Sequence, residues 1–219
     1  MNDSKQTKLT REDIKTIYNN PDYWNVSPYD GTSYSDVYAG IADLVGQCIG
    51  LPIQSRWNDF FRCRYTNKQV VEIGCARGWL LKDVQDRGGA IAGVDVSSYV
   101  TKLSPVKDFI HVGFIEDGTP FNTDQFDIGF SVENLEHLID LDAGLKEIHR
   151  IMKPNGVFYF SAGLDADENR HINLMSRDDW KIKVENAGFK VMEEETKKFL
   201  AHRLAREYGW NSYITRAVK

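Results

Sequence analysis

Short apolar runs alternate with segments of helical periodicity from residue 69 onward, and this alternation constrains the fold more than any other feature. Five runs have the length and composition of buried strands: 69–73, 90–95, 109–112, 126–130 and 157–160. The stretches 141–151 and 176–187 carry apolar side chains at helical spacing. This order of elements predicts an α/β fold in which a mostly parallel sheet is doubly wound by helices.

The part of the chain before residue 69 does not follow this alternation. Helical spacing of apolar side chains predicts three helices there, over 11–18, 35–49 and 53–64. Thr10 and Asp13 match the cap of the first helix, and residues 22–34 have the composition of a loop. We therefore expect an N-terminal helical cap or lid over residues 1–68 and a single compact domain over residues 69–219.

The composition argues against several classes of protein. The 219 residues carry a formal net charge of −5, so the chain has no general attraction to nucleic acid. Its three cysteines are widely spaced and odd in number, which argues against a disulfide framework or a zinc site. The polar N-terminus and the lack of a long apolar run predict a cytoplasmic protein with no membrane partner. No pattern indicates an oligomeric state.

A glycine-containing turn joins the first of these strands to the helix that follows. The segment reads Val70-Val-Glu-Ile-Gly-Cys-Ala-Arg-Gly-Trp-Leu-Leu81, and Asp95 ends the next strand along the chain. Such a turn brings backbone N–H groups to the negative end of a ligand, and an aspartate there can accept hydrogen bonds from ribose hydroxyls. A nicotinamide dinucleotide requires G-x-G-x-x-G, but Ala76 and Trp79 occupy the second and third glycine positions.

The same turn resembles motif I of the class I methyltransferases, written E/D-x-G-x-G-x-G. Glu72, Gly74 and Gly78 match it, and Ala76 replaces the middle glycine. Five further segments resemble the family's later motifs in order: Val94–Ser97, Pro120–Ile128, Leu135–Leu138, Ile148–Gly156 and Trp180–Phe189. The resemblance covers residues 68–190. It implies a seven-stranded sheet whose last strand, expected over 212–218 beside 191–196, is antiparallel.

The resemblance also implies a cofactor, S-adenosylmethionine, which becomes S-adenosylhomocysteine. The turn 74–78, which includes Cys75 and Ala76, is expected beneath the methionine moiety, with its N–H groups facing the carboxylate. Glu72 is expected to support this loop or the methionine ammonium group, and Asp95 to bind the ribose.

At the adenine, the family often has an aspartate after the third strand, but Phe114 stands near that place. We expect Val96 and Phe114 to pack on the adenine and the backbone near Ile115 or Glu116 to bind it. Ser131 and Val132, which end the fourth strand, are expected to face the sulfonium. Aromatic rings suit the surroundings of a cationic sulfur, and the candidates are Tyr23, Trp24, Tyr29, Tyr34, Tyr38 and Trp79.

Three side chains are candidates for the chemistry of transfer. A hydroxyl acceptor needs a base, and His137 follows the fourth strand, where the acceptor meets the methyl group in this family. His171 lies in Asp167-Glu-Asn-Arg-His-Ile-Asn173, which is similar to a segment of methyltransferases associated with sugars and surface glycans. Both histidines could instead order the backbone, and Glu133 could orient the acceptor or take its proton. No metal site is predicted.

The sequence thus predicts a methyltransferase for a small polar acceptor, and we expect O-methylation of a sugar or metabolite hydroxyl. N-methylation of a small molecule is an alternative, as is a non-catalytic partner protein that keeps the fold. A nucleic-acid methyltransferase is disfavoured by the acidic charge and by the lack of a basic appendage.

Overall fold

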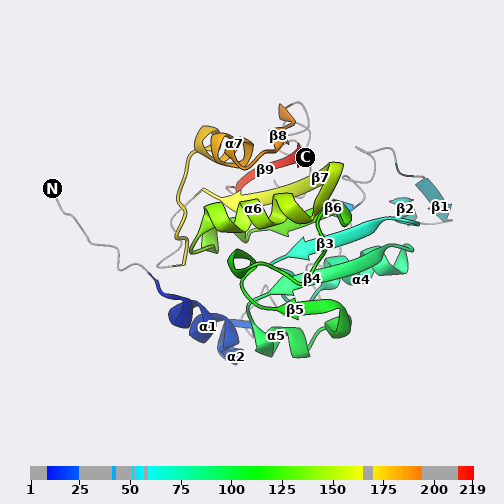
Figure 1. Ribbon diagram of the computed structural model, residues 1–219. Coiled ribbons are helices and arrows are strands. Elements are labelled where there is room, and N and C mark those ends of the chain that lie inside the picture. The colour runs from blue at the N-terminus through cyan, green and yellow to red at the C-terminus, as the bar shows by residue number, and fades with distance from the viewer. Residues whose placement is uncertain are drawn as a thin grey trace.

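A seven-stranded sheet forms the centre of the molecule in a computed structural model that describes residues 9–24, 41–42, 51, 53–56, 59–164, 170–193 and 212–219. The strand order is β5-β4-β3-β6-β7-β9-β8 (Figure 1). The strands are β3 Gln69–Ile73, β4 Ala90–Asp95, β5 Ile110–Val112, β6 Phe126–Val132, β7 Met152–Gly163, β8 Lys190–Val191 and β9 Ser212–Val218. Strands β3 to β7 are parallel, and β9 pairs antiparallel with both β7 and β8. The predicted fold class is confirmed.

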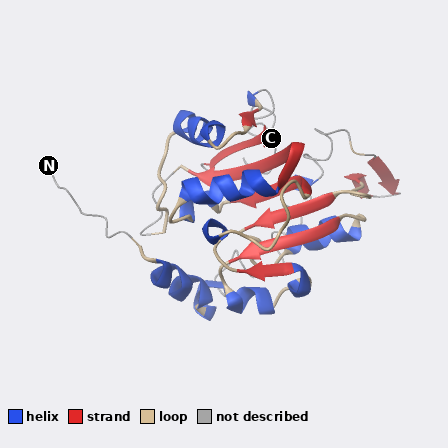
Figure 2. Cartoon of the chain, viewed as in Figure 1, coloured by secondary structure: helices blue, strands red, loops and turns tan. Residues whose placement is uncertain are grey.

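Helices cover both faces of this sheet (Figure 2). They are α4 Trp79–Asp86, α5 Ser98–Lys102, α6 Leu141–Ile151 and α7 Arg177–Asn186. Alternate residues of β3 face opposite layers: Val71 and Ile73 pack in one cluster with α6 and α7, and Val70 packs in another with α4. Asp140 and Ser176 cap the N-termini of α6 and α7, so these two helices begin where the sequence predicts.

The N-terminal segment departs from prediction in two places. Helix α1 (Arg11–Asn19) has the expected capping box, but α2 (Pro21–Trp24) follows it where a loop was expected. The helix predicted over 53–64 is wrong, because β1 (Ile53–Arg56) and β2 (Asp59–Cys63) form an antiparallel pair. Aromatic and β-branched residues favour strands, and a short apolar run fits either element by periodicity alone.

Strand β7 is longer than the predicted run. The expected turn at 153–156 lies inside this strand. The pairing register shifts there, because Phe126 and Ile128 of β6 pair with Met152 and Val157. Strand β8 is short, and residues 194–196 of the expected strand lie outside the described residues, as does most of the helix expected over 35–49. Among the described residues, no helix combines the length and the apolar character that a membrane crossing requires.

Candidate active site

A cavity of about 330 Å³ opens where the carboxyl ends of β3, β4, β5 and β6 meet. The chain reverses its winding direction between β3 and β6, and α/β sheets bind their ligands at such a point. One end of the cavity, here called the loop end, is lined by Gly74, Ala76, Asp95 and Phe114. The other, the histidine end, is lined by Glu133, Glu136, His137 and His171.

The turn after β3 leaves no room for a side chain at Gly74. Gly74 has φ +71°, and a Cβ there would lie 2.3 Å from the side chain of Asn134. Gly78 has φ +68° and is the N-cap of α4, so its left-handed conformation sets the direction of the helix. Ala76 has φ +45°, a conformation that alanine adopts at a cost. The turn therefore presents backbone to the cavity.

Asp95 lies directly beside this turn. Its Oδ2 accepts a hydrogen bond from the N–H of Ala76 at 2.7 Å, and its Oδ1 accepts one from the N–H of Ser97 at 2.8 Å. Burial raises the pKa of Asp95 to about 6, and the bonds from Ser97 and Ala76 oppose that shift. A carboxylate has about four acceptor positions, so the two that remain can bind hydroxyl groups of a ligand in the cavity.

Eight of the predicted cofactor residues line the cavity: Gly74, Ala76, Asp95, Val96, Phe114, Ile115, Glu116 and Val132. Five are not among its lining residues: Glu72, Cys75, Gly78, Trp79 and Ser131. Glu72 is 3% exposed, and its pKa lies well above the usual value because of burial and the charge of Asp95. These five residues lie in or next to the elements that carry the lining, where they can support it.

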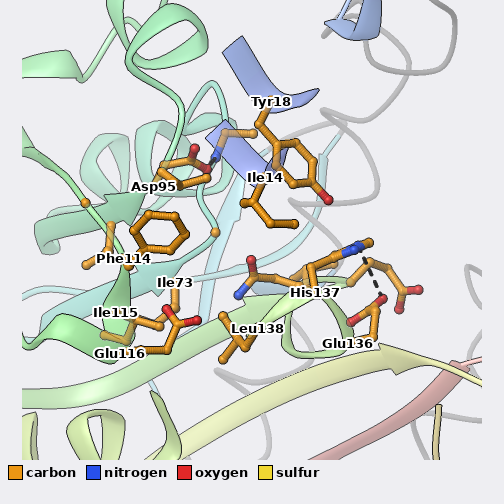
Figure 3. A pocket seen from close by; sticks show the side chains of 18 of the residues that line it. Ile14, Tyr18, Ile73, Asp95, Phe114, Ile115, Glu116, Glu136, His137 and Leu138 are labelled. Carbon is orange, nitrogen blue, oxygen red and sulfur yellow. Dashed lines mark hydrogen bonds and ion pairs between the residues drawn. The ribbon is translucent and has the colours of Figure 1, made fainter. Parts of the chain in front are cut away.

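Phe114 forms one wall of the loop end beside Asp95 and Ile115 (Figure 3). The guanidinium carbon of Arg11 lies 4.9 Å from the centre of its ring. One oxygen of Glu116 is engaged, because its Oε1 accepts a hydrogen bond from the N–H of Ile139 at 3.0 Å, whereas its buried Oε2 has no hydrogen-bond partner among the described residues. This wall can therefore offer a ring face and backbone groups to a flat heterocycle.

Helices α1 and α2 cover the cavity on another side. Their lining residues are Ile14, Tyr18, Tyr23 and Trp24. The carbonyl of Tyr18 accepts a hydrogen bond from Trp24 Nε1 at 2.7 Å within this cover and one from Ser97 Oγ at 2.5 Å, and the second bond ties the cover to the turn after β4.

Two of the aromatic candidates, Tyr23 and Trp24, therefore line the cavity, Trp79 does not, and Tyr29, Tyr34 and Tyr38 lie outside the described residues. Sequence reasoning missed Ile14 and Tyr18. The helical spacing of these two residues on α1 could have indicated that they share a face.

The three predicted catalytic residues meet at the histidine end. The rings of His137 and His171 have centroids 5.0 Å apart, and Nδ1 of His137 lies 3.1 Å from the carbonyl oxygen of Arg170. Glu133 accepts a hydrogen bond from Ser212 Oγ at 2.8 Å. Burial raises the pKa of Glu133, and its hydrogen bonds to Ser161 and Ser212 oppose the shift. Segments far apart in the chain thus form one polar cluster.

Glu136 belongs to the same cluster, and sequence reasoning missed it. Its side chain is fully buried, its Oε1 accepts the N–H of Gly163 at 3.0 Å, and that oxygen lies 4.0 Å from Nε2 of His137 (Figure 3). Burial raises the pKa of Glu136 to about 8, and the neighbouring charge of Glu133 adds to the shift. The sequence carried only the motif Leu135–Leu138, which does not reveal the burial of its glutamate.

Comparisons with known proteins agree with this geometry. The sequence profile of a family described as "Methyltransferase domain" matches residues 53–194. A ubiquinone biosynthesis O-methyltransferase of Pseudomonas syringae is 29% identical over 117 residues, which cover 50% of this chain and 50% of the relative. A sterol 4-C-methyltransferase of Caenorhabditis elegans is 28% identical over 101 residues, which cover 42% and 30% of the two chains. The chain spans about half the length, or less, of these curated relatives.

A solved structure shows the same fold at lower identity. The crystal structure of an S-adenosylmethionine-dependent methyltransferase from Mesorhizobium loti has a TM-score of 0.58 and 16% identity, and the match covers 87% of this chain and 99% of that one. A likeness at this level of identity concerns the fold alone.

Proposed function

The chain belongs to the class I S-adenosylmethionine-dependent methyltransferases, and from this premise we propose that it methylates a hydroxyl group of a small polar acceptor. One observation carries the proposal: a single cavity connects the loop end, which suits a nucleoside, to a cluster of titratable side chains. A methyl donor at one end would then meet proton-accepting groups at the other.

The residues of the loop end fit S-adenosylmethionine. Gly74 and Ala76 line the cavity without a long side chain, so the turn can meet a ligand with its backbone N–H groups, as a carboxylate requires. Asp95 keeps free acceptor positions for two ribose hydroxyls, and Phe114 offers a ring to the adenine. Residues 69–219 would form the catalytic domain, and residues 1–68, which include α1 and α2, would form a lid.

The bound cofactor supplies a methyl group on sulfur, and its transfer forms a C–O bond, breaks the C–S bond and leaves S-adenosylhomocysteine and a proton. The chain's part is to align the acceptor and to take that proton from its hydroxyl. His137, His171 and Glu133 line the cavity together, so each is within the region where the acceptor would lie. An imidazole is suited to this role near neutral pH.

Two observations bear on the class of the acceptor. The ubiquinone O-methyltransferase relative supports a hydroxyl acceptor, and the segment around His171 is similar to one found in sugar-associated methyltransferases. We propose a sugar or another polyhydroxylated metabolite. N-methylation and a non-catalytic partner role are the alternatives that the test must separate.

Incubation with methyl-labelled S-adenosylmethionine and matched acceptors tests this proposal. Each hydroxyl compound, chosen among monosaccharides and catechols, is paired with its amine analogue and its O-methylated derivative. We expect label in the hydroxyl compounds and none in the O-methylated ones. Label in the amines alone would establish N-methylation, and a lack of S-adenosylmethionine binding in calorimetry would favour the non-catalytic role.

A further inference from the structure

Two buried carboxyl groups at the histidine end each keep one oxygen without a hydrogen-bond partner among the described residues. Glu133 Oε1 and Glu136 Oε2 are both inaccessible to solvent and have no hydrogen-bond partner within the part of the chain that the structure describes. Ionising a buried carboxyl group is costly unless donors or a cation satisfy its oxygens, so each unpartnered oxygen favours a cation beside it. Both residues line the cavity, so an ion that enters it would lie next to these side chains.

Three side chains of this cluster converge as metal ligands do. One ligand atom each from Glu136, His137 and His171 lies within 4.8 Å of the other two. Two imidazoles and a carboxylate are a common ligand set for first-row divalent ions.

The backbone holds the three residues in place. The carbonyl of Glu136 accepts the N–H of Ile172 at 2.8 Å and that of Asn173 at 2.9 Å. The side chain of Asn173 donates to the carbonyl of Leu138 at 2.7 Å. These bonds fasten the segment after His171 to the turn that carries Glu136 and His137. The cluster is therefore pre-organised by two segments, one before α6 and one after β7 in the sequence. Because the ligands are divided between these distant segments, their spacing in the sequence does not reveal the set.

We propose that Glu136, His137 and His171 bind a divalent cation, with Glu133 beside it. The positive charge compensates the two carboxylates, and three protein ligands leave coordination positions open toward the cavity. Cation binding is a property of these side chains alone, whereas its part in catalysis rests on the proposed function.

The open positions define the acceptor more narrowly. An acceptor with two neighbouring oxygens, a vicinal diol or a catechol, can chelate the ion with both. A bound ion would act as a Lewis acid that lowers the pKa of the acceptor hydroxyl, and Glu133 would take the proton as the C–O bond forms and the C–S bond of the cofactor breaks. The ion would be neither oxidised nor reduced.

Titration of the chelator-treated full chain with Mn²⁺, followed by the electron paramagnetic resonance signal of the free ion, tests the site without acceptor or cofactor. We expect one Mn²⁺ per chain with micromolar affinity, and a loss of at least tenfold in Glu136→Gln and in His171→Ala. His111→Ala, outside the cavity on β5, is the matched control and should bind as the unaltered chain does. Thermal unfolding and S-adenosylmethionine affinity verify that each variant is folded. If Glu136→Gln does not fold, His171→Ala alone tests the site.

Two results would overturn the site: no saturable binding of Mn²⁺ or Zn²⁺, or binding that both substitutions leave unchanged. Failure of the proposed function has a different signature, because the ion would then bind while no hydroxyl compound is methylated. If both hold, methylation of a catechol should stop on chelation and return with Mn²⁺, and a catechol should exceed the corresponding phenol as an acceptor.

Discussion

The loop end and the histidine end of the cavity are built on different principles. At the loop end, residues 74–78 and 95–97 bring backbone groups together, and one carboxylate ties the two segments. At the histidine end, side chains from η3 (Leu135–His137), β9 and the segment after β7 place buried carboxylates beside imidazoles. Binding of a constant ligand can depend on backbone shape, whereas chemistry on a variable acceptor depends on side chains. A substitution at the loop end should therefore change cofactor affinity, and one at the histidine end should change kcat.

Removal of an imidazole should give the largest effect and confine it to the histidine end. We expect His171→Ala to lower kcat by a factor of roughly 100 or more, because loss of a positioned acid–base or ligand group has that magnitude. The affinity for S-adenosylmethionine should stay within about twofold, since His171 lies at the other end of the cavity. Steady-state kinetics with an acceptor that the protein methylates give kcat, and calorimetry with the cofactor gives its affinity.

His111→Ala is the matched control for this substitution. It removes an imidazole from β5 that does not line the cavity, so kcat should not change. If His171→Ala weakened cofactor binding as much as it slowed turnover, the separation of the two ends would be wrong.

A methyl group at Gly74 should break the loop end instead. Gly74→Ala combines an unfavourable φ with a Cβ 2.3 Å from Asn134, and together they strain the turn by about 3 kcal/mol. If the turn escapes this strain by leaving the geometry that binds the cofactor, affinity should fall by up to about 100-fold. Gly118→Ala is the matched control, because Gly118 has φ +85° with nothing within 4 Å of an added Cβ. It should lose about 1–3 kcal/mol of stability and no affinity.

A double variant tests the cause. Asn134→Ala removes the two atoms nearest to the added methyl group, so Gly74→Ala with Asn134→Ala should regain part of the affinity for S-adenosylmethionine measured by calorimetry. If Gly74→Ala and Gly118→Ala lost the same cofactor affinity, the unfavourable φ of alanine, and not the contact with Asn134, would account for the loss.

The loop end could be predicted from the sequence because its information is local. A strand, a glycine turn and an aspartate at the end of the next strand determine their own geometry, and Gly74, Ala76 and Asp95 lie together as expected. The alternation of elements also sufficed for the sheet, since parallel strands joined by helices have few possible arrangements.

The histidine end could be predicted only as separate candidates. That Glu136 is buried, and that its carbonyl receives the backbone of Ile172 and Asn173, follows from tertiary packing between segments distant in the chain. The pair β1 and β2 was missed for a related reason, because the run 53–64 has no periodicity that excludes a helix.

The titration of Asp95 should give a smaller, pH-dependent effect at the loop end alone. With a pKa of about 6, Asp95 is mostly ionised at pH 7 and mostly protonated at pH 5. The ionised form accepts ribose hydroxyls, so affinity for S-adenosylmethionine should fall about tenfold between pH 7 and pH 5. Calorimetry at several pH values measures this, and Asp95→Asn should bind more weakly and without that dependence.

Stability of the ligand-free protein should change in the opposite direction over a neighbouring range. Because the pKa of Asp95 is raised from 3.8, the folded state binds more protons than the unfolded state between about pH 4 and pH 6. This residue's contribution to the free energy of unfolding therefore falls as pH rises through that range. An Asp95→Asn variant with the same pH dependence of unfolding would assign the change to other groups.

The smallest expected effect concerns the position where this chain departs from the family's glycine pattern. Ala76 has φ +45°, so Ala76→Gly relieves a conformational cost of about 1 kcal/mol, and the added flexibility of the unfolded chain cancels part of that gain. We expect a net stabilisation of about 0.5 kcal/mol, or a rise in Tm of about 1–2 °C. Cofactor affinity should hold, because the N–H group that donates to Asp95 remains. The same substitution at Ala143, in the first turn of α6, should lower Tm instead, since glycine disfavours a helix. If Ala76→Gly also lowered Tm, the turn would owe its shape to the alanine side chain, and the loop end would depend on more than its backbone.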